Sequence, residues 1–167
     1  MNSLVKPIAG ILTSRKDVLE GVLEMMESLF GEPDIKGEWQ PFHHTDYYDA
    51  EMGADLSRCF VSFAKLVPDE AAAGFKQFTQ EVEYRFAARG QRLVNIDPGY
   101  LDSSKLVLIS GKQGGHKIAL APGVYADMLL WYNKGWEAMP WAFPDFRDGG
   151  LFPLFTRMRT AFKKQRS

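Results

Sequence analysis

The sequence has a single cysteine, Cys59, and its formal net charge at pH 7 is −1, from 20 basic and 21 acidic residues. One cysteine excludes an internal disulfide and a zinc site built from several thiolates, and it favours a reducing compartment. The balanced charge supplies neither the basic field that nucleic-acid-binding proteins use nor a strongly acidic one. We therefore expect a cytoplasmic protein whose partner is not a nucleic acid.

Long uninterrupted apolar segments are also missing. The longest nearly uncharged run, IALAPGVYADMLLWY, contains Asp127 and a Pro-Gly pair, so it is too short and too interrupted to cross a bilayer. The N-terminal segment MNSLVKPIAGILTSRKD has an apolar run broken by Pro7 and Gly10, and no cleavage site of the kind that ends a signal peptide. The pattern predicts neither membrane association nor export.

What is present is the composition of an ordinary globular protein. Of the 167 residues, 46% are apolar, 25% are charged and 13% are aromatic. This length fits one domain with a sizeable core. Neither an internal repeat nor a low-complexity linker divides the chain. We predict a single α+β domain over residues 1–167.

An amphipathic helix is the clearest element near the N-terminus. Residues 7–14 predict a short buried strand, and Ser14 with Asp17 three residues later resembles a capping box that starts the helix. Gly31 predicts its end, because glycine readily adopts the left-handed conformation of a helix C-cap. The apolar stripe of this helix consists of Val18, Leu19, Val22, Leu23, Met26, Leu29 and Phe30.

Strands and a second helix follow. Strands are predicted at residues 38–48, 58–67 and 91–97. A helix over residues 69–89, ending at Gly90, precedes the last of them. Its inner stripe consists of Phe75, Phe78, Val82 and Phe86.

The C-terminal third predicts a hairpin and a last helix. Residues 102–110 suit either a short helix capped by Asp102 or a strand, and we favour the helix. The hairpin joins residues 116–120 to residues 124–132. The inward positions of the last helix are Leu151, Phe155, Met158 and Phe162. This order predicts a mostly antiparallel sheet with a split βαβ, ferredoxin-like core, extended by the hairpin and helix.

The stretch VNIDPGY is the first candidate for a polar site. A two-residue period places Asn95 and Asp97 on one face of a strand, and Pro98-Gly99 predicts a type II turn that starts at Asp97. Asp97 could simply accept backbone N–H groups across that turn. Asn95 is harder to explain in this way, because strand interiors disfavour Asn unless its amide is used. Asn95 therefore favours a ligand at the strand end.

The stretch PFHHTDYYDAEMG is the second candidate. In a strand, Phe42, His44, Asp46 and Tyr48 would share one face. His44 and Asp46, together with Glu51, are candidate metal ligands. The alternative is an exposed edge strand whose polar face meets water.

Two loops complete the set. The glycines and lysines of SGKQGGHK either form an anion-binding loop or a flexible connection, and they do not match the P-loop pattern. His116 follows as a site member or a solvent-facing residue. In MPWAFPDFRDGG we expect Trp141, Phe143 and Phe146 to pack against the sheet. Arg147 is a candidate for binding a carboxylate or phosphate.

The motifs FHHTDYYDAEMG, FVSF, VNIDPGYL, HKIAL and PWAFPDFR, in this order, resemble a bacterial family of uncharacterised proteins, a domain-of-unknown-function family of about this length. The resemblance covers essentially the whole chain and implies no established activity. Some members of that family are labelled GTP-binding. This sequence has no Walker A run and no Asn-Lys-x-Asp motif, so we do not expect a G-domain, and nucleotide binding by another route stays open.

Three functions follow from these segments. The first is binding of a small molecule, a nucleotide or another phosphate-bearing ligand at the strand ends. The second is a metal-assisted hydrolase or phosphoryl-handling enzyme in which Asp46 and Asp97 act as bases or metal ligands and His116 as an acid. The third is a protein-interaction module or homodimer that uses the aromatic C-terminal segment.

We favour binding. The candidate ligand-binding residues are Asp46, Tyr48, Asn95, Asp97, Tyr100, His116 and Arg147. The sequence assigns no cofactor and no catalytic residue, so whether the protein is an enzyme stays open.

Overall fold

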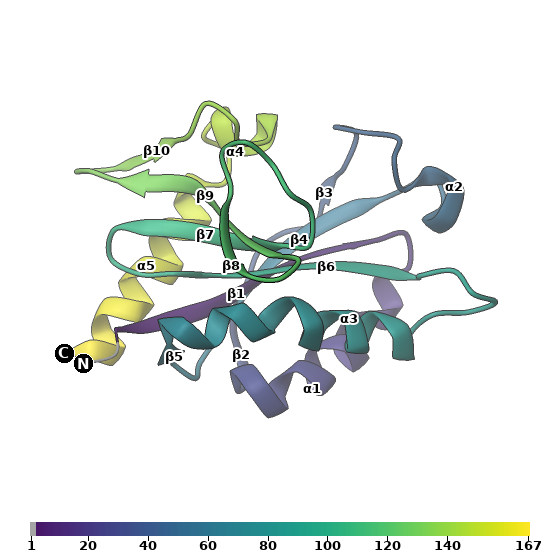
Figure 1. Cartoon of the computed structure of the whole chain (residues 1–167), viewed down its shortest axis with the longest axis horizontal. Helices are drawn as coiled ribbons and strands as arrows, with labels where there is room; N and C mark the ends of the chain where they lie inside the picture. Colours follow the sequence, from purple (N-terminus) through teal and green to yellow (C-terminus); the bar gives the residue numbers. More distant parts are fainter. Residues whose placement is uncertain (1–2) are drawn as a thin grey trace.

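The computed structural model describes residues 3–167 as a large open antiparallel sheet with helices packed against it (Figure 1). The strands are β1 Leu4–Thr13, β2 Pro33–Lys36, β3 Gln40–Pro41, β4 Ser57–Phe63, β5 Val67–Pro68, β6 Val94–Leu101, β7 Lys105–Ser110, β8 Ile118–Ala121, β9 Val124–Tyr132 and β10 Trp136–Ala138. The α-helices are α1 Leu19–Phe30, α2 Asp49–Met52, α3 Phe75–Arg85, α4 Pro144–Arg147 and α5 Phe152–Arg166, with 3₁₀ turns η1 Lys16–Val18 and η2 Asp69–Gly74. Among these residues no helix has the length and apolar character that a membrane span requires.

The predicted ferredoxin-like core is present. Four strands lie in the order β6-β1-β4-β2, and each neighbouring pair is antiparallel. Helix α1 connects β1 to β2, and α3 connects β4 to β6, which is the split βαβ arrangement. Strands β7, β9 and β10 extend the sheet beyond β6, and the predicted hairpin is formed by β8 and β9. The fold class is therefore confirmed.

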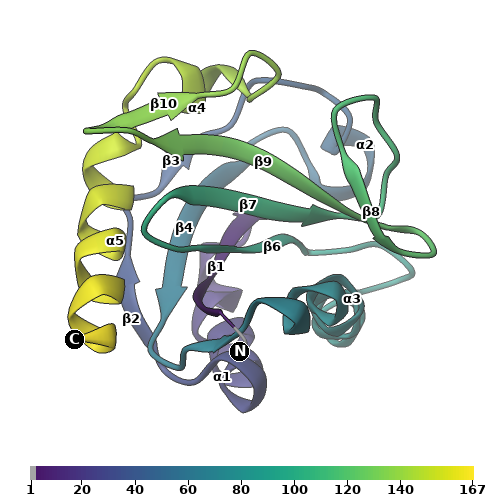
Figure 2. The same ribbon diagram turned by 60° about the vertical axis from the view of Figure 1, so that its left-hand side comes forward.

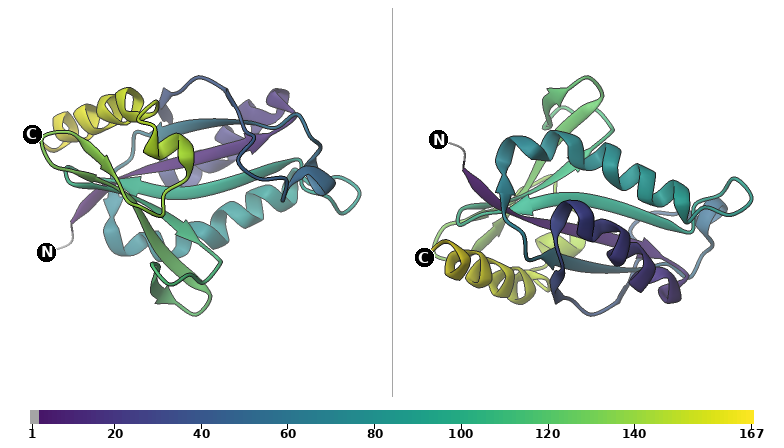
Figure 3. Two further views of the ribbon diagram at one scale, coloured as in Figure 1. Left: turned by 90° about the horizontal axis from the view of Figure 1, so that it is seen from above. Right: turned by 90° about the horizontal axis from the view of Figure 1, so that it is seen from below.

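Alternating residues on β1 face two different cores. Ala9 and Ile11 face a core beneath α1 and α3, and the two helices lie side by side across this face in the right-hand view, seen from below (Figure 3). Ile8 faces a second core that α5 closes on the other side of the sheet (Figure 2). The two-residue period of a strand thus distributes one apolar run between two cores.

A buried lysine connects the two ends of the chain. Lys6 on β1 has no exposed surface. It forms an ion pair with Asp34 and donates hydrogen bonds to the carbonyl of Phe63 and to Gln165 Oε1, both at 2.9 Å. Because a buried charge is tolerated only when it is paired and hydrogen-bonded, these contacts tie β1, β2, β4 and α5 together.

The strand predicted at residues 38–48 is wrong. Only Gln40–Pro41 pairs with β4, and after the buried Phe42 the chain turns through exposed residues 43–47 into α2. The side chain of Thr45 accepts a hydrogen bond from the backbone N–H of Tyr47, a local turn that competes with strand pairing. The predicted alternation of His44 and Asp46 along a strand face therefore does not exist.

Two helical predictions also need correction. Residues 105–110 form β7 rather than a helix, and Asp102 closes the preceding turn by accepting the N–H groups of Ser104 and Lys105. Ser14 does not cap α1, because its hydroxyl donates to the carbonyl of Met52. The end of α1 at Gly31, with φ of 76°, is as predicted.

The second predicted helix is shorter than expected. It begins as the 3₁₀ turn η2, and α3 ends at Arg85 rather than at residue 89. Phe75 and Val82 are buried as its stripe predicts. The residues beyond Arg85 bend back through a bridge between Ala88 and Gln91.

Pro98 and Gly99 do not form a turn. Both lie inside β6, where Pro98 pairs with Ala9 and Gly99 pairs with Ile8 on one side and Leu108 on the other. A Cβ on Gly99 would lie 2.1 Å from the carbonyl oxygen of Val107. Glycine is needed here because the neighbouring backbone approaches so closely.

Gly99→Ala should lower the free energy of unfolding by about 1–3 kcal/mol, the usual cost of forcing an extra carbon into a packed region. Chemical and thermal unfolding would measure the loss. Gly135→Ala is the matched control, because no atom lies within 4 Å of the Cβ it would add. Equal stability of the two variants would contradict the close approach.

Candidate functional site

A slot opens in the sheet where β6 and β7 separate. Residues 99–101 of β6 pair with residues 106–108 of β7, and the pairing stops at Gly99. Pro98 has no backbone N–H, so it cannot donate the next hydrogen bond to β7. The N–H and C=O groups of every second residue point to the same edge of a strand, so those of Ile96 point to this unpaired edge as well. The missing donor of Pro98 thus explains why β6 continues along β1 alone.

Helix α3 satisfies the exposed edge of β6. The backbone N–H of Ile96 donates to Glu83 Oε2 at 3.2 Å, and the Ile96 carbonyl accepts from Lys76 Nζ at 3.3 Å. These two side chains replace the hydrogen bonds that a neighbouring strand would have made. The backbone of β6 inside the slot therefore has hydrogen-bond partners although no strand pairs with it there.

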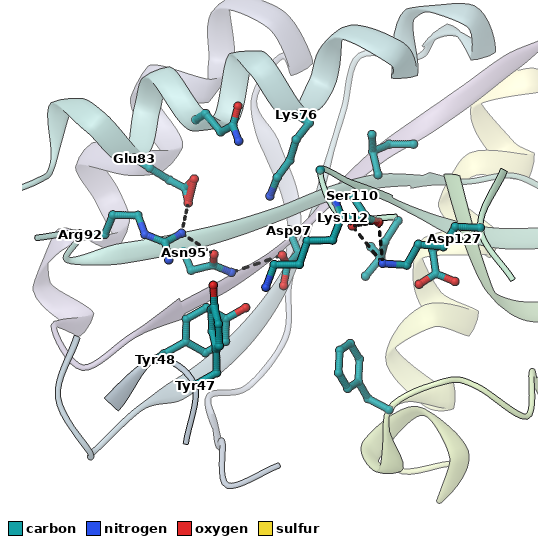
Figure 4. Close-up of a pocket in the computed structure, with 16 residues that line it drawn as sticks. Tyr47, Tyr48, Lys76, Glu83, Arg92, Asn95, Asp97, Ser110, Lys112 and Asp127 are labelled. Carbon is teal, nitrogen blue, oxygen red and sulfur yellow. Dashed lines mark hydrogen bonds and ion pairs between the residues drawn. The ribbon is translucent and has the colours of Figure 1, made fainter. Parts of the chain in front are cut away.

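The slot contains a cavity of about 410 Å³, which we call the β6–β7 cavity (Figure 4). Its charged lining residues are Lys76, Glu83, Arg92, Asp97, Lys112, Lys117 and Asp127. A second cavity of about 290 Å³, the aromatic cavity, is lined by Leu12, Phe42, Thr45, Tyr47, Tyr48, Arg58, Asp97, Lys112 and Phe143. The two share Tyr47, Tyr48, Asp97, Lys112 and Phe143, so they adjoin one another.

A chain of hydrogen bonds holds Asp97 in place. Arg92 binds both carboxylate oxygens of Glu51, at 2.9 and 3.0 Å, and donates to Asn95 Oδ1 at 2.9 Å. Asn95 Nδ2 then donates to Asp97 Oδ1 at 3.3 Å (Figure 4). Arg92 also contacts Glu83 at 3.3 Å. Both polar ends of the Asn95 amide are thus used, which explains an Asn in a buried strand.

The charges around Arg92 shift one another's pKa values. Hydrogen bonds to Glu51 raise the pKa of Arg92, and the same bonds lower the pKa of Glu51. Burial raises the pKa of Glu83, although Lys76, Ile96 and Arg92 oppose the shift. Glu83 therefore depends on its cationic neighbours to stay ionised.

Lysines without a carboxylate partner surround the cavity. Lys76 donates to the Ile96 carbonyl, and Lys112 Nζ lies 3.9 Å from the centre of the Tyr47 ring. Lys117 donates to Ser110 Oγ and to the Lys112 carbonyl, both at 3.1 Å. Within residues 3–167, none of the three forms a salt bridge. This arrangement leaves positive charge directed at the cavity.

Arg58 is a site residue that the sequence reasoning missed. Its side chain is 5% exposed, lies 4.9 Å from the Phe42 ring and 5.0 Å from the Phe60 ring, and forms an ion pair with Asp145. Burial lowers its pKa to about 10, against the opposing charges of Asp97 and Tyr48. The available signal was a charged residue at an inward position of the strand RCFVSF.

Three predicted ligand-binding residues come together. Tyr48, Asn95 and Asp97 all line the β6–β7 cavity. Burial raises the pKa of Tyr48 to about 12, so its hydroxyl stays protonated at neutral pH. The predicted face of β6 that carries Asn95 and Asp97 is therefore the face that meets the slot.

The other four lie elsewhere. Asp46 is exposed and lines neither cavity. Tyr100 packs on the opposite face of the sheet, against the core beneath α1 and α3. His116 does not line the cavity; it stacks on Trp141, with ring centres 5.1 Å apart, and its Nε2 lies 3.4 Å from Oδ1 of the lining residue Asp127. Arg147 is exposed on α4.

The candidate metal ligands are not brought together. His44 Nε2 lies 3.7 Å from Asp145 Oδ2, and Glu51 is occupied by Arg92. Burial and Arg58 lower the pKa of His44. Within the described part of the chain, no group of three or more His, Cys, Asp or Glu side chains could hold a metal ion.

Residues 3–162 match the family described as Domain of unknown function (DUF4416). The chain belongs to this family. That membership confirms the resemblance to a domain-of-unknown-function family over essentially the whole chain. No curated protein sequence matches it.

In this DUF4416 domain, Arg92→Met should lower the free energy of unfolding by about 1–3 kcal/mol, because Glu83 keeps a buried charge without its cation. The loss should be larger at pH 8 than at pH 5. A carboxyl group whose pKa is raised on folding makes the protein less stable as pH rises. Without Arg92 the pKa of Glu83 should be raised further, so this loss of stability should be larger. The lowered pKa of Glu51 adds to the loss at both pH values, since its stabilisation is fully present above its ordinary pKa and disappears only as pH falls through the folded-state pKa.

Urea unfolding at the two pH values would measure these losses. Arg15→Met is the control, because the Arg15–Asp17 pair is exposed and its removal should leave the midpoint unchanged. A loss that is the same at both pH values would contradict the role of Arg92.

Proposed function

We propose that this protein binds a small phosphate-bearing ligand in the β6–β7 cavity. The observation that supports it most directly is the pair Lys76 and Lys112, whose ammonium groups border the cavity and form no salt bridge among residues 3–167. A volume of about 410 Å³ is within the usual range for small-molecule sites. Lysine is a common phosphate ligand because it supplies three donors and a compact charge.

The loop SGKQGGHK supplies one of the two lysines. Lys117 holds this loop by donating to Ser110 Oγ and to the Lys112 carbonyl. Lys117 thus acts on the backbone that carries Lys112, while the Lys112 side chain points across the slot towards Asp97 (Figure 4). Lys76 approaches from α3 on the other side. A phosphate between them would receive charge-assisted hydrogen bonds from two separate elements.

The carboxylates of the cavity limit what can bind. Arg92 pairs with Glu83, whereas Asp97 has no salt bridge within the described residues. A purely anionic ligand such as pyrophosphate can bind at the lysines, but repulsion from Asp97 should make it bind more weakly than a ligand that also donates a hydrogen bond to Asp97. A ligand with an anionic end at the lysines and hydrogen-bond donors at Asp97 fits better.

The other two functions have less support. A hydrolase that uses Asp46 with Asp97 would need both in one site, and Asp46 lines neither cavity. An interaction module built on the last helix would need exposed rings, yet Phe155 and Phe162 on α5 are buried. Trp141 and Phe143 are 42% and 44% exposed, and Phe143 lines both cavities. We therefore retain ligand binding.

Inorganic pyrophosphate, as the probe, should stabilise the protein against thermal unfolding and bind measurably by calorimetry. Lys76→Ala and Lys112→Ala should each weaken its affinity about tenfold, the effect of losing roughly 1.4 kcal/mol from a charge-assisted hydrogen bond. Raising the salt concentration should weaken it further.

Lys163→Ala is the control, because Lys163 is exposed in the last turn of α5. The proposal fails if pyrophosphate produces no shift, or if all three lysine variants lose affinity equally. Asn95→Ala should weaken the binding of ligands that donate to Asp97 more than the binding of pyrophosphate, since Asn95 orients Asp97.

A further inference from the structure

The aromatic cavity continues the β6–β7 cavity away from Lys76 and Lys117, with Lys112 on the wall that the two cavities share. Its apolar walls come from Leu12, Phe42, Tyr48 and Phe143. A volume of about 290 Å³ bounded by aromatic side chains suits a flat ring better than a flexible chain. A ligand whose phosphate lies between Lys76 and Lys112 can therefore extend a ring into this second space.

Arg58 is a hydrogen-bond donor on the wall of the aromatic cavity. Its guanidinium carries five N–H groups. Its Nη2 atom forms an ion pair with Asp145 Oδ2, and its other guanidinium N–H groups form no hydrogen bond with the described residues, although Arg58 lines the cavity. The surrounding phenyl rings of Phe42 and Phe60 supply no acceptor oxygen. A ligand carbonyl would give this cation an acceptor.

Asp97 is a hydrogen-bond acceptor on the same wall. Its carboxylate receives one side-chain hydrogen bond, from Asn95 at 3.3 Å, and the chain through Arg92 to Glu51 sets the position of Asn95. Its oxygens therefore keep room for donors from a ligand.

Register places Arg58 and Asp97 on opposite sides of β1. Leu12 on β1 pairs with Arg58 on β4, and Gly10 pairs with Asp97 on β6. Because neighbouring strands lie about 4.8 Å apart and the two register partners are two residues apart along β1, the two Cα atoms are separated by roughly 12 Å. A long Arg side chain and a short Asp can then face one ring edge together.

We propose that the ligand carries a planar heterocycle with adjacent C=O and N–H groups, a lactam edge, whose carbonyl accepts from Arg58 and whose N–H donates to Asp97. This inference rests on the proposed phosphate site. A ring with the inverted edge would direct a lone pair at Asp97 and an amino group at Arg58. A site with fixed hydrogen-bonding groups rejects such a ring, because its own polar groups are left unpaired.

Two pairs of nucleotides, whose members differ in the hydrogen-bonding edge of the ring, test which edge the site prefers. Uridine and cytidine 5′-monophosphates share sugar and phosphate, and their ring edges are inverted; inosine and adenosine 5′-monophosphates form the second pair. The lactam member of each pair should bind about tenfold or more tightly in calorimetry. Equal affinities within both pairs, or preference for the amino members, would overturn the inference.

Asp97→Asn separates ring recognition from phosphate binding. The amide is isosteric, so the fold should persist, and it can donate as well as accept. The ratio of affinities within each pair should fall towards one, while pyrophosphate still binds. An unchanged ratio would show that Asp97 does not read the ring.

Pyrophosphate also keeps the two proposals distinguishable. If pyrophosphate binds and neither pair is discriminated, only the lactam inference fails. If neither pyrophosphate nor any nucleotide binds, the phosphate site fails and the inference fails with it.

Discussion

The missing backbone donor of Pro98 and the missing side chain of Gly99 determine where β6 and β7 separate. Gly99 allows the last close contact with Val107, and Pro98 cannot extend the ladder beyond it. The unpaired edge of Ile96 is then satisfied by Lys76 and Glu83 from α3. The β6–β7 cavity depends on this opening, because a continuous ladder would leave no space for a cavity inside the sheet.

Buried charge is the second constraint. The partly buried Arg92 is shared by Glu51, the buried Glu83 and Asn95, and the buried Arg58 lies among phenyl rings beside Asp145. Charges removed from water need such partners, so each cation fixes the position of several elements at once. The lysines of the slot differ, since they border a cavity without a carboxylate partner among residues 3–167. This contrast separates structural cations from those that a ligand would use.

Prediction from the sequence succeeded for the parts that depend on local pattern. The order of strands and helices gave the ferredoxin-like core, and the two-residue period placed Asn95 and Asp97 on the correct face. The prediction failed where the same short motif can occur in two different local structures. Pro-Gly was interpreted as a turn and lies in a strand, and Ser14 was interpreted as a cap and binds Met52.

The sequence by itself determined the core helices, the central strands and the polar face of β6, because periodicity records which side of an element is buried. Only the tertiary structure decided which polar residues meet. Lys76 and Glu83 on α3 reach β6, and Arg58 on β4 lines the same cavity as Asp97. The spacing of these residues in the sequence does not predict that they meet. Asp46, Tyr100 and Arg147 looked equally suitable in the sequence, but the packing of strands and loops directs them elsewhere. The reason is physical: local pattern sets the face of a residue, whereas its neighbours depend on how distant elements pack.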